Sequence, residues 1–217
     1  MQVKLLSHQP LSNAVIGGRT CWNSFHKGGC YQTATDDISD DDKEFLSRTI
    51  NKHKHGSIAE HIVYCFTIKG VTRALLQELS RHRMSSPSVR SSRYTLKELK
   101  EEYSFYYEET GYYDTERAKK YIKLTGNHQV DSLSIKALDN LRWLVQQNIA
   151  NDMVKYALPE CYLTELTWTI NARSLSNFLA LRSSPAALWE IRDLTGALFN
   201  AIPMSHRFLY EDIIQSK

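Results

Sequence analysis

The sequence has few cysteines, little net charge and no long apolar segment. Its four cysteines are Cys21, Cys30, Cys65 and Cys161, without Cys-x-x-Cys spacing, which argues against a disulfide scaffold and favours reduced thiols. The formal net charge is only +3, so no strong overall field favours nucleic acid or a membrane surface. No apolar run approaches the length of about 18 residues expected for a membrane helix, and residues 1–10 do not resemble a signal peptide. We therefore expect a cytoplasmic protein that binds neither membranes nor nucleic acid.

The sequence also lacks the short fingerprints of common phosphate and metal sites. Its glycine pairs, at 17–18 and 28–29, do not have dinucleotide or phosphate-loop spacing, which favours simple turns. His53 and His55 are two residues apart, which on a helix would place them on different faces. No His-Glu-x-x-His pattern is present. We therefore predict no metal site, and expect these histidines to line a turn.

The length of 217 residues and the hydrophobic content of 42% favour one domain, residues 1–217, with a substantial core. Apolar residues recur with both helical and strand periods. Ser39 or Asp40 can cap the helix that begins at residue 40, and Asn171 can cap the one that begins at residue 172. The patterns predict strands at 3–6, 61–68 and 162–170, and helices at 40–54, 71–79, 131–158, 172–182 and 186–201. The expected fold class is α/β, with a mixed sheet flanked by long helices.

The most unusual stretch is residues 81–94, which holds four arginines, one histidine and five serines. Because Pro87 disfavours a helical residue before it, we expect the preceding helix to end there and an irregular Ser-rich loop to follow. Arginine forks and serine hydroxyls bind phosphate oxygens, and each charge-assisted hydrogen bond contributes roughly 1.5–3 kcal/mol. The alternative interpretation is a solvated basic loop at a helix C-terminus.

Arg81-His82-Arg83, followed by seven residues and Ser91, resembles the signature of flavin-dependent thymidylate synthases. Ser92-Arg93-Tyr94 continues the match, and residues 171–182 form a second one. This resemblance implies the fold of that family and the FAD-dependent reductive methylation of dUMP to dTMP. It also implies methylenetetrahydrofolate as carbon donor, NADPH as reductant, and a homotetramer with active sites between subunits.

The same resemblance implies roles for individual residues. Arg182 is the first candidate for catalysis, assisted by Arg81. The implied flavin contacts are His55, Ser57, Glu60, Arg81, His82, Arg83, Ser88, Asn171, Arg173 and Asn177. The implied nucleotide contacts are Glu78, Arg81, Ser91, Ser92, Arg93, Lys155 and Arg182. A serine in a motif invites a nucleophile role, but no local base accompanies Ser91, so we expect it to bind the nucleotide.

Three positions depart from the family pattern. Glu78 stands where the family has glutamine, and Val89 where glutamate is common. Lys155 replaces an arginine, which keeps the charge but loses the bidentate fork. Helical phase adds a further expectation about residues 171–182. Arg173 and Asn177 share a face, whereas Arg182 lies about half a turn out of phase and should serve a different surface.

A second class of function is a nucleic-acid-binding module built on residues 81–93, with aromatic side chains available for stacking. The acidic residues at 98–114 argue against it. The aromatic stretch 94–113 is itself open to two interpretations, a core edge with a solvated face or a platform that stacks a pterin or flavin ring.

Overall fold

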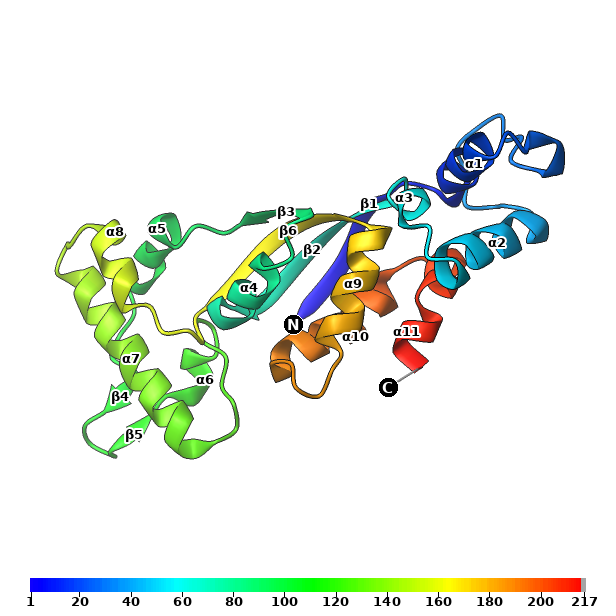
Figure 1. Ribbon diagram of the computed structural model, residues 1–217. Coiled ribbons are helices and arrows are strands. Elements are labelled where there is room, and N and C mark those ends of the chain that lie inside the picture. Colours follow the sequence, from blue (N-terminus) through cyan, green and yellow to red (C-terminus); the bar gives the residue numbers. More distant parts are fainter. Residues whose placement is uncertain (216–217) are drawn as a thin grey trace. The chain divides into compact units, whose positions relative to one another are not determined.

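The computed structural model describes residues 1–215 (Figure 1). The chain divides into two compact units. The first unit contains Met1–Ile68, Leu79–Pro87 and the chain from Thr167 onward, and the second contains Lys69–Glu78 and Ser88–Leu166. Helices and strands are both well represented, which confirms the predicted α/β class. No helix within residues 1–215 is both long and apolar enough to cross a membrane.

One four-stranded sheet has the order β1-β2-β6-β3. The strands are β1 (Gln2–His8), β2 (Val63–Thr72), β6 (Leu163–Asn171) and β3 (Ser85–Val89). The first three correspond to the predicted strands, and β2 buries Tyr64, Phe66 and Ile68 on one face, as its alternation predicts. The prediction of an irregular loop after the helix was wrong, because β3 is there. Pro87 is compatible with this strand because β3 lies at the sheet edge, where a missing N–H is tolerated.

The first unit contains several helices around its part of the sheet. Their bounds are α1 (Leu11–Cys21), η1 (Phe25–Lys27), α2 (Asp40–Leu46), η2 (Ser47–Lys52), α3 (Gly56–Ala59), α9 (Ala172–Arg182), α10 (Trp189–Ala201), η5 (Met204–Leu209) and α11 (Glu211–Gln215). Of the two candidates for the cap of α2, Ser39 is the N-cap, because its Oγ accepts from Asp42 N at 3.2 Å. The predicted cap Asn171 is confirmed, because its Oδ1 accepts from Ser174 N at 2.8 Å. Helix α10 packs against β1 and α9 (Figure 1).

The predicted helix at 40–54 is regular only as far as Leu46. It continues as the π-helix η2, where the N–H of His53 reaches back five residues to the carbonyl of Arg48 at 2.9 Å. Such turns hold one residue more than an α-helical turn and occur often at functional sites. The side chains that follow η2 therefore point in other directions than they would after a continuous α-helix.

The second unit has its own apolar core. Its elements are α4 (Arg73–Ser80, whose last two residues belong to the first unit), α5 (Ser92–Thr95), η3 (Leu96–Leu99), β4 (Tyr106–Tyr107), β5 (Tyr112–Tyr113), α6 (Thr115–Ala118), α7 (His128–Gln146), α8 (Asn151–Val154) and η4 (Lys155–Ala157). Side chains such as Phe105, Leu138 and Leu141 are fully buried there. The predicted helix at 131–158 was wrong in its continuity: Asn148 has φ 55°, which ends α7, and α8 starts afresh. The predicted helix at 71–79 begins later, because β2 extends to Thr72.

Candidate active site

A cavity of about 890 Å³ lies in the first unit, and we refer to it as the arginine cavity. Eight of the residues predicted from sequence line it: Glu60, Arg81, His82, Arg83, Asn171, Arg173, Asn177 and Arg182. Met84, Ser174 and Leu181 complete the lining. Both family-like stretches, far apart in the sequence, therefore meet at one cavity.

Helix α9 supplies one wall because its two faces differ. Arg173, Asn177 and Leu181 recur every four residues on the exposed face, whereas Leu175 and Phe178 are buried on the other. The cap at Asn171 fixes where the helix begins and so sets this phase. The local sequence thereby aims an arginine and an amide at the same cavity.

The expectation that Arg182 serves a different surface from Arg173 and Asn177 was wrong, because all three line the arginine cavity. Arg182 is the last residue of α9, and its long side chain reaches His82, one hundred positions earlier in the chain. The reach of a guanidinium thus overrides the half-turn difference in helical phase.

Arg182 and His82 form the most specific contact of the cavity. Arg182 Nε donates to His82 Nε2 at 2.9 Å, so this ring nitrogen acts as an acceptor and carries no proton in this arrangement. The imidazole also packs edge-on against Phe178, with ring centroids 4.8 Å apart. The two contacts hold the Arg182 guanidinium at the cavity wall.

The electrostatics of the arginine cavity favour anions. Four arginines line it against one carboxylate, Glu60. Arg173 Nη1 pairs with Glu60 Oε1 at 2.7 Å, and both side chains remain largely exposed, at 61% and 45%. Arginine is suited to phosphates and carboxylates because its fork donates two parallel hydrogen bonds. The cavity can therefore hold a ligand with phosphate groups and a ring that uses amide contacts.

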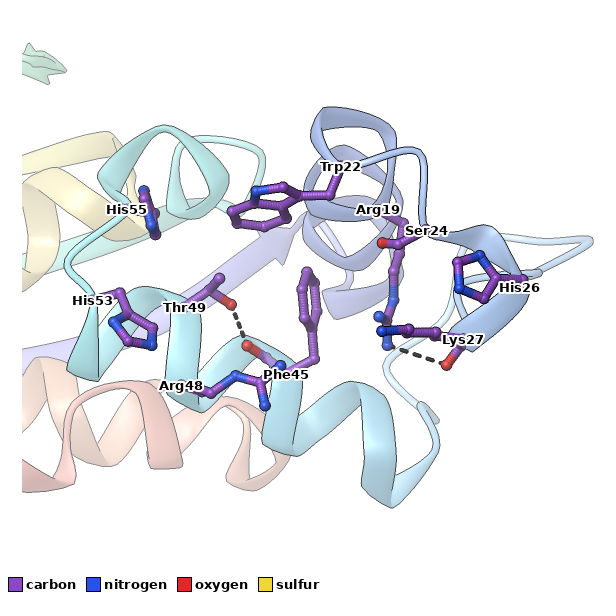
Figure 2. A pocket seen from close by; sticks show the side chains of 10 residues that line it. All are labelled: Arg19, Trp22, Ser24, His26, Lys27, Phe45, Arg48, Thr49, His53 and His55. Carbon is purple, nitrogen blue, oxygen red and sulfur yellow. Dashed lines mark hydrogen bonds between the residues drawn. The ribbon is translucent and has the colours of Figure 1, made fainter.

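A second cavity of about 380 Å³ in the same unit is the tryptophan cavity, lined by Arg19, Trp22, Ser24, His26, Lys27, Phe45, Arg48, Thr49, His53 and His55. Figure 2 shows Trp22 and Phe45 in its middle, with the two histidines of the 53–55 turn at one end and Lys27 at the other. The Trp22 ring meets Phe45 and His55 edge-on, at centroid distances of 5.9 and 5.5 Å. Aromatic walls flanked by cationic groups suit a planar, anionic ligand.

Comparison with known proteins places the chain in a family. Residues 4–204 match the family model described as thymidylate synthase complementing protein. The chain belongs to this family. A flavin-dependent thymidylate synthase of Campylobacter jejuni (strain RM1221) is 54% identical over 211 residues, covering 97% of this chain and 96% of that protein. One from Wolinella succinogenes is 52% identical over 210 residues, covering 97% of each.

The fold agrees with this family. The crystal structure of thymidylate synthase X from Helicobacter pylori with FAD and dUMP matches with a TM-score of 0.88 and 47% identity, covering 99% of this chain and all of that one. The sequence resemblance to flavin-dependent thymidylate synthases is thus confirmed, and so is the family fold. The chain is a member of an enzyme family of methyltransferase type.

Several residues that the family resemblance singles out lie in the second unit. Ser91 occupies the N-cap position of α5, Ser92 is buried, and Lys155 follows α8. Asn151 Nδ2 donates to the carbonyl oxygen of Arg93 at 2.7 Å, which ties α8 to α5. Within the second unit, this contact joins the segment of Ser91, Ser92 and Arg93 to the helix that Lys155 follows.

The remaining predicted residues line neither large cavity. Ser57 is exposed on α3, Ser88 is exposed on β3, and Glu78 lies on α4. In contrast, sequence reasoning missed Trp22 and Arg48 of the tryptophan cavity. No spacing rule joins residue 22 to residues 45–55; the π-helix η2 and the packing of α1 against α2 and α3 bring them together.

Proposed function

We propose that this chain converts dUMP to dTMP with bound FAD, methylenetetrahydrofolate as carbon donor and NADPH as reductant. The observation that carries the proposal is the arginine cavity, where the Arg182–His82 contact is surrounded by three more arginines and two asparagines. Family membership and the ligands of the Helicobacter pylori structure support it.

The residues of the arginine cavity fit FAD by their chemistry. Arg81, Arg83 and Arg173 supply charge for a pyrophosphate, and Asn177 offers an amide for the polar edge of a flavin ring. The volume of about 890 Å³ lies within the range expected of a site for a small molecule. When bound, FAD would take hydride from NADPH and give it to the transferred one-carbon unit.

In this proposal the chain acts mainly through fixed positive charge. The uracil ring becomes a carbon nucleophile as electron density moves toward its reacting carbon, and negative charge builds up on its oxygens. The Arg182 guanidinium, held by His82, stabilises that charge without having to reorganise, and Arg81 assists it. Ser91, Ser92, Arg93 and Lys155 bind and orient the nucleotide, with no covalent step on Ser91.

The tryptophan cavity is the proposed place for the folate. Its indole and phenyl rings suit a pterin or benzoyl ring, and the Arg48 and Lys27 side chains suit carboxylates. His55, which the family resemblance links to flavin and folate, lies at one end of this cavity. We also propose that residues 1–217 work as one synthase domain in a cytoplasmic homotetramer, with active sites completed between subunits.

The first test is an absorbance spectrum of the purified protein before and after addition of FAD and then dUMP. We expect flavin bands that stay with the protein on gel filtration and shift when dUMP is added, and dTMP formation once folate and NADPH are present. A folded protein that retains no flavin and does not respond to dUMP would refute the proposal.

The catalytic role of Arg182 is tested by Arg182→Ala. We expect turnover to fall by about 100–1,000-fold, because a preorganised charge is lost from the transition state, while flavin stays bound. Arg182→Lys should recover part of the rate. Arg192→Ala is the matched control and should keep full turnover. Within residues 1–215, the Arg192 guanidinium donates only to the carbonyl oxygen of Pro185. Loss of flavin with unchanged turnover per flavin would contradict this role.

A further inference from the structure

His8, Asp36 and His206 form a cluster in the first unit that the proposed reaction does not use. They come from the end of β1, the loop before α2, and η5. Asp36 lies between the two imidazoles: its Oδ2 is 2.6 Å from His8 Nε2, and its Oδ1 is 2.7 Å from His206 Nε2. One donor atom from each of the three residues lies within 4.8 Å of the others. Three ligand-type atoms from distant segments thus lie in one cluster.

The contacts of Asp36 show how the cluster is held together without a metal. Besides its contacts with the two imidazoles, Asp36 Oδ1 accepts a hydrogen bond from the backbone N–H of Leu11 at 3.0 Å. A bound ion would replace the two contacts between Asp36 and the imidazoles. It would be held by an ionised carboxylate and neutral imidazoles, which are the forms that bind metals.

A second layer of contacts orients His206. Its Nδ1 lies 2.9 Å from the Tyr64 hydroxyl, and Tyr210 donates to that hydroxyl at 3.1 Å. Both tyrosines are fully buried. Histidines that bind metals generally donate their other ring N–H to an oxygen, which fixes the ring and the tautomer. When an ion is bound, His206 would carry its proton on Nδ1 and donate it to Tyr64, and the lone pair of Nε2 would bind the ion instead of the Nε2 atom contacting Asp36.

We propose that His8, Asp36 and His206 bind a divalent transition-metal ion, with zinc the best match. Two imidazoles and one carboxylate form a common three-ligand zinc set, which leaves a fourth position for water. The His206 side chain is fully buried, but those of His8 and Asp36 are 26% and 28% exposed, which gives an ion access and room for that water. The ion would fasten η5 to β1 and to the loop before α2.

The test uses the full chain, dialysed against a chelator and titrated with zinc chloride in a calorimeter. We expect one zinc ion per chain in the wild type, and affinity at least about 100-fold lower in His8→Ala and Asp36→Asn, because each removes a direct ligand. His128→Ala is the matched control, since His128 is exposed at the start of α7, and it should bind as the wild type does. Cobalt should give a visible absorbance band in the wild type and the control alone.

Thermal unfolding gives a second measurement. Zinc should raise the midpoint of the wild type and of His128→Ala, and leave that of His8→Ala unchanged. If Asp36→Asn does not fold, His8→Ala decides alone, because that side chain lies at the surface of the cluster. Two results would overturn the proposal: a zinc affinity of the wild type equal to that of His8→Ala, or a thermal midpoint of the wild type that zinc does not raise. Either would mean that the cluster is a hydrogen-bonded support without a metal.

Discussion

Two arginine–carboxylate pairs in the first unit have the same distance between nitrogen and oxygen, but one pair is buried and the other is exposed. Arg19 and Asp42 meet at 2.7 Å with side chains only 6% and 2% exposed. Arg173 and Glu60 also meet at 2.7 Å, but both are largely exposed at the arginine cavity. Distance alone therefore does not distinguish a pair that supports the fold from a pair that is available to a ligand.

The difference lies in how many other groups hold each carboxylate. Asp42 also accepts from the backbone N–H of Gly29 at 3.0 Å and from the Tyr31 hydroxyl at 2.8 Å, and the Arg19 guanidinium lies 4.1 Å from the centre of the Phe45 ring. A buried charge held in this way is costly to leave unpaired, whereas an exposed pair exchanges easily with water or ligand. Arg19 of the buried pair lines the tryptophan cavity, and both members of the exposed pair line the arginine cavity.

Asp42→Ala should produce the largest loss of stability. It leaves the Arg19 guanidinium buried without its carboxylate, which typically costs about 3–5 kcal/mol. Urea unfolding at fixed protein concentration measures the change. A free energy of unfolding within about 1 kcal/mol of the wild type would show that the buried pair does not support the fold.

Acid should remove the same contribution in the wild type. Burial raises the pKa of Asp42, but hydrogen bonds from Arg19, Tyr31 and Gly29 together lower it by more. The net pKa is therefore below the ordinary 3.8. The stabilisation is thus fully present above pH 3.8 and is lost as the pH falls through the lower pKa of the folded state. The gap in unfolding free energy between wild type and Asp42→Ala should narrow over that range; a gap independent of pH would contradict the assignment.

Two glycines, one beside each arginine–carboxylate pair, allow matched substitutions that test the difference between the buried and the exposed pair. A Cβ at Gly28, which has φ +139°, would meet Asp42 Oδ1 at 2.6 Å, and a Cβ at Gly56 would meet Arg173 Nε at 2.7 Å. Gly28→Ala combines backbone strain with a carboxylate that cannot move, so we expect a loss of about 1–3 kcal/mol.

Gly56→Ala should only displace a flexible, exposed arginine. We therefore expect stability within about 0.5 kcal/mol of the wild type and weaker flavin retention. Unfolding curves and flavin content of the two variants check this together. Equal destabilisation by both substitutions would remove the distinction between the two pairs.

Arg173→Ala should have the smallest effect on stability, at most about 1 kcal/mol, because its ion pair is exposed. Its expected effect is on flavin, where loss of one charge-assisted hydrogen bond, worth roughly 1.5–3 kcal/mol, weakens affinity about 10–100-fold. Fluorescence titration with FAD measures the change. Flavin affinity equal to that of the wild type would exclude Arg173 from the flavin site.

Much of this molecule could be predicted where the information is local. The alternation in residues 162–170 and the cap at Asn171 gave β6 and the start of α9 almost to the residue. The two family-like stretches identified most of the arginine cavity. Periodicity and capping depend on neighbours a few positions apart, and these are visible in the sequence.

The failures concern contacts between distant residues or small backbone irregularities. Residues 85–89 form a strand only because a sheet edge is available to them, and the break near Asn148 depends on one left-handed residue. The arrangement of His8, Asp36 and His206 spans almost the whole chain, and no spacing rule relates those positions. Helical phase alone also misplaced Arg182, because it ignores how far a guanidinium reaches.

The π-helix at Ser47–Lys52 makes chain length matter as much as side-chain identity. An α-helix turns by about 100° per residue, so one extra residue rotates everything after it by that amount. Deleting a single residue within 47–52 would restore a regular helix and carry His55 away from the Trp22 ring, which it now meets at a centroid distance of 5.5 Å. Every side chain of the tryptophan cavity would still be present in the sequence. An insertion or deletion at this point would therefore alter the cavity more than most substitutions in its walls.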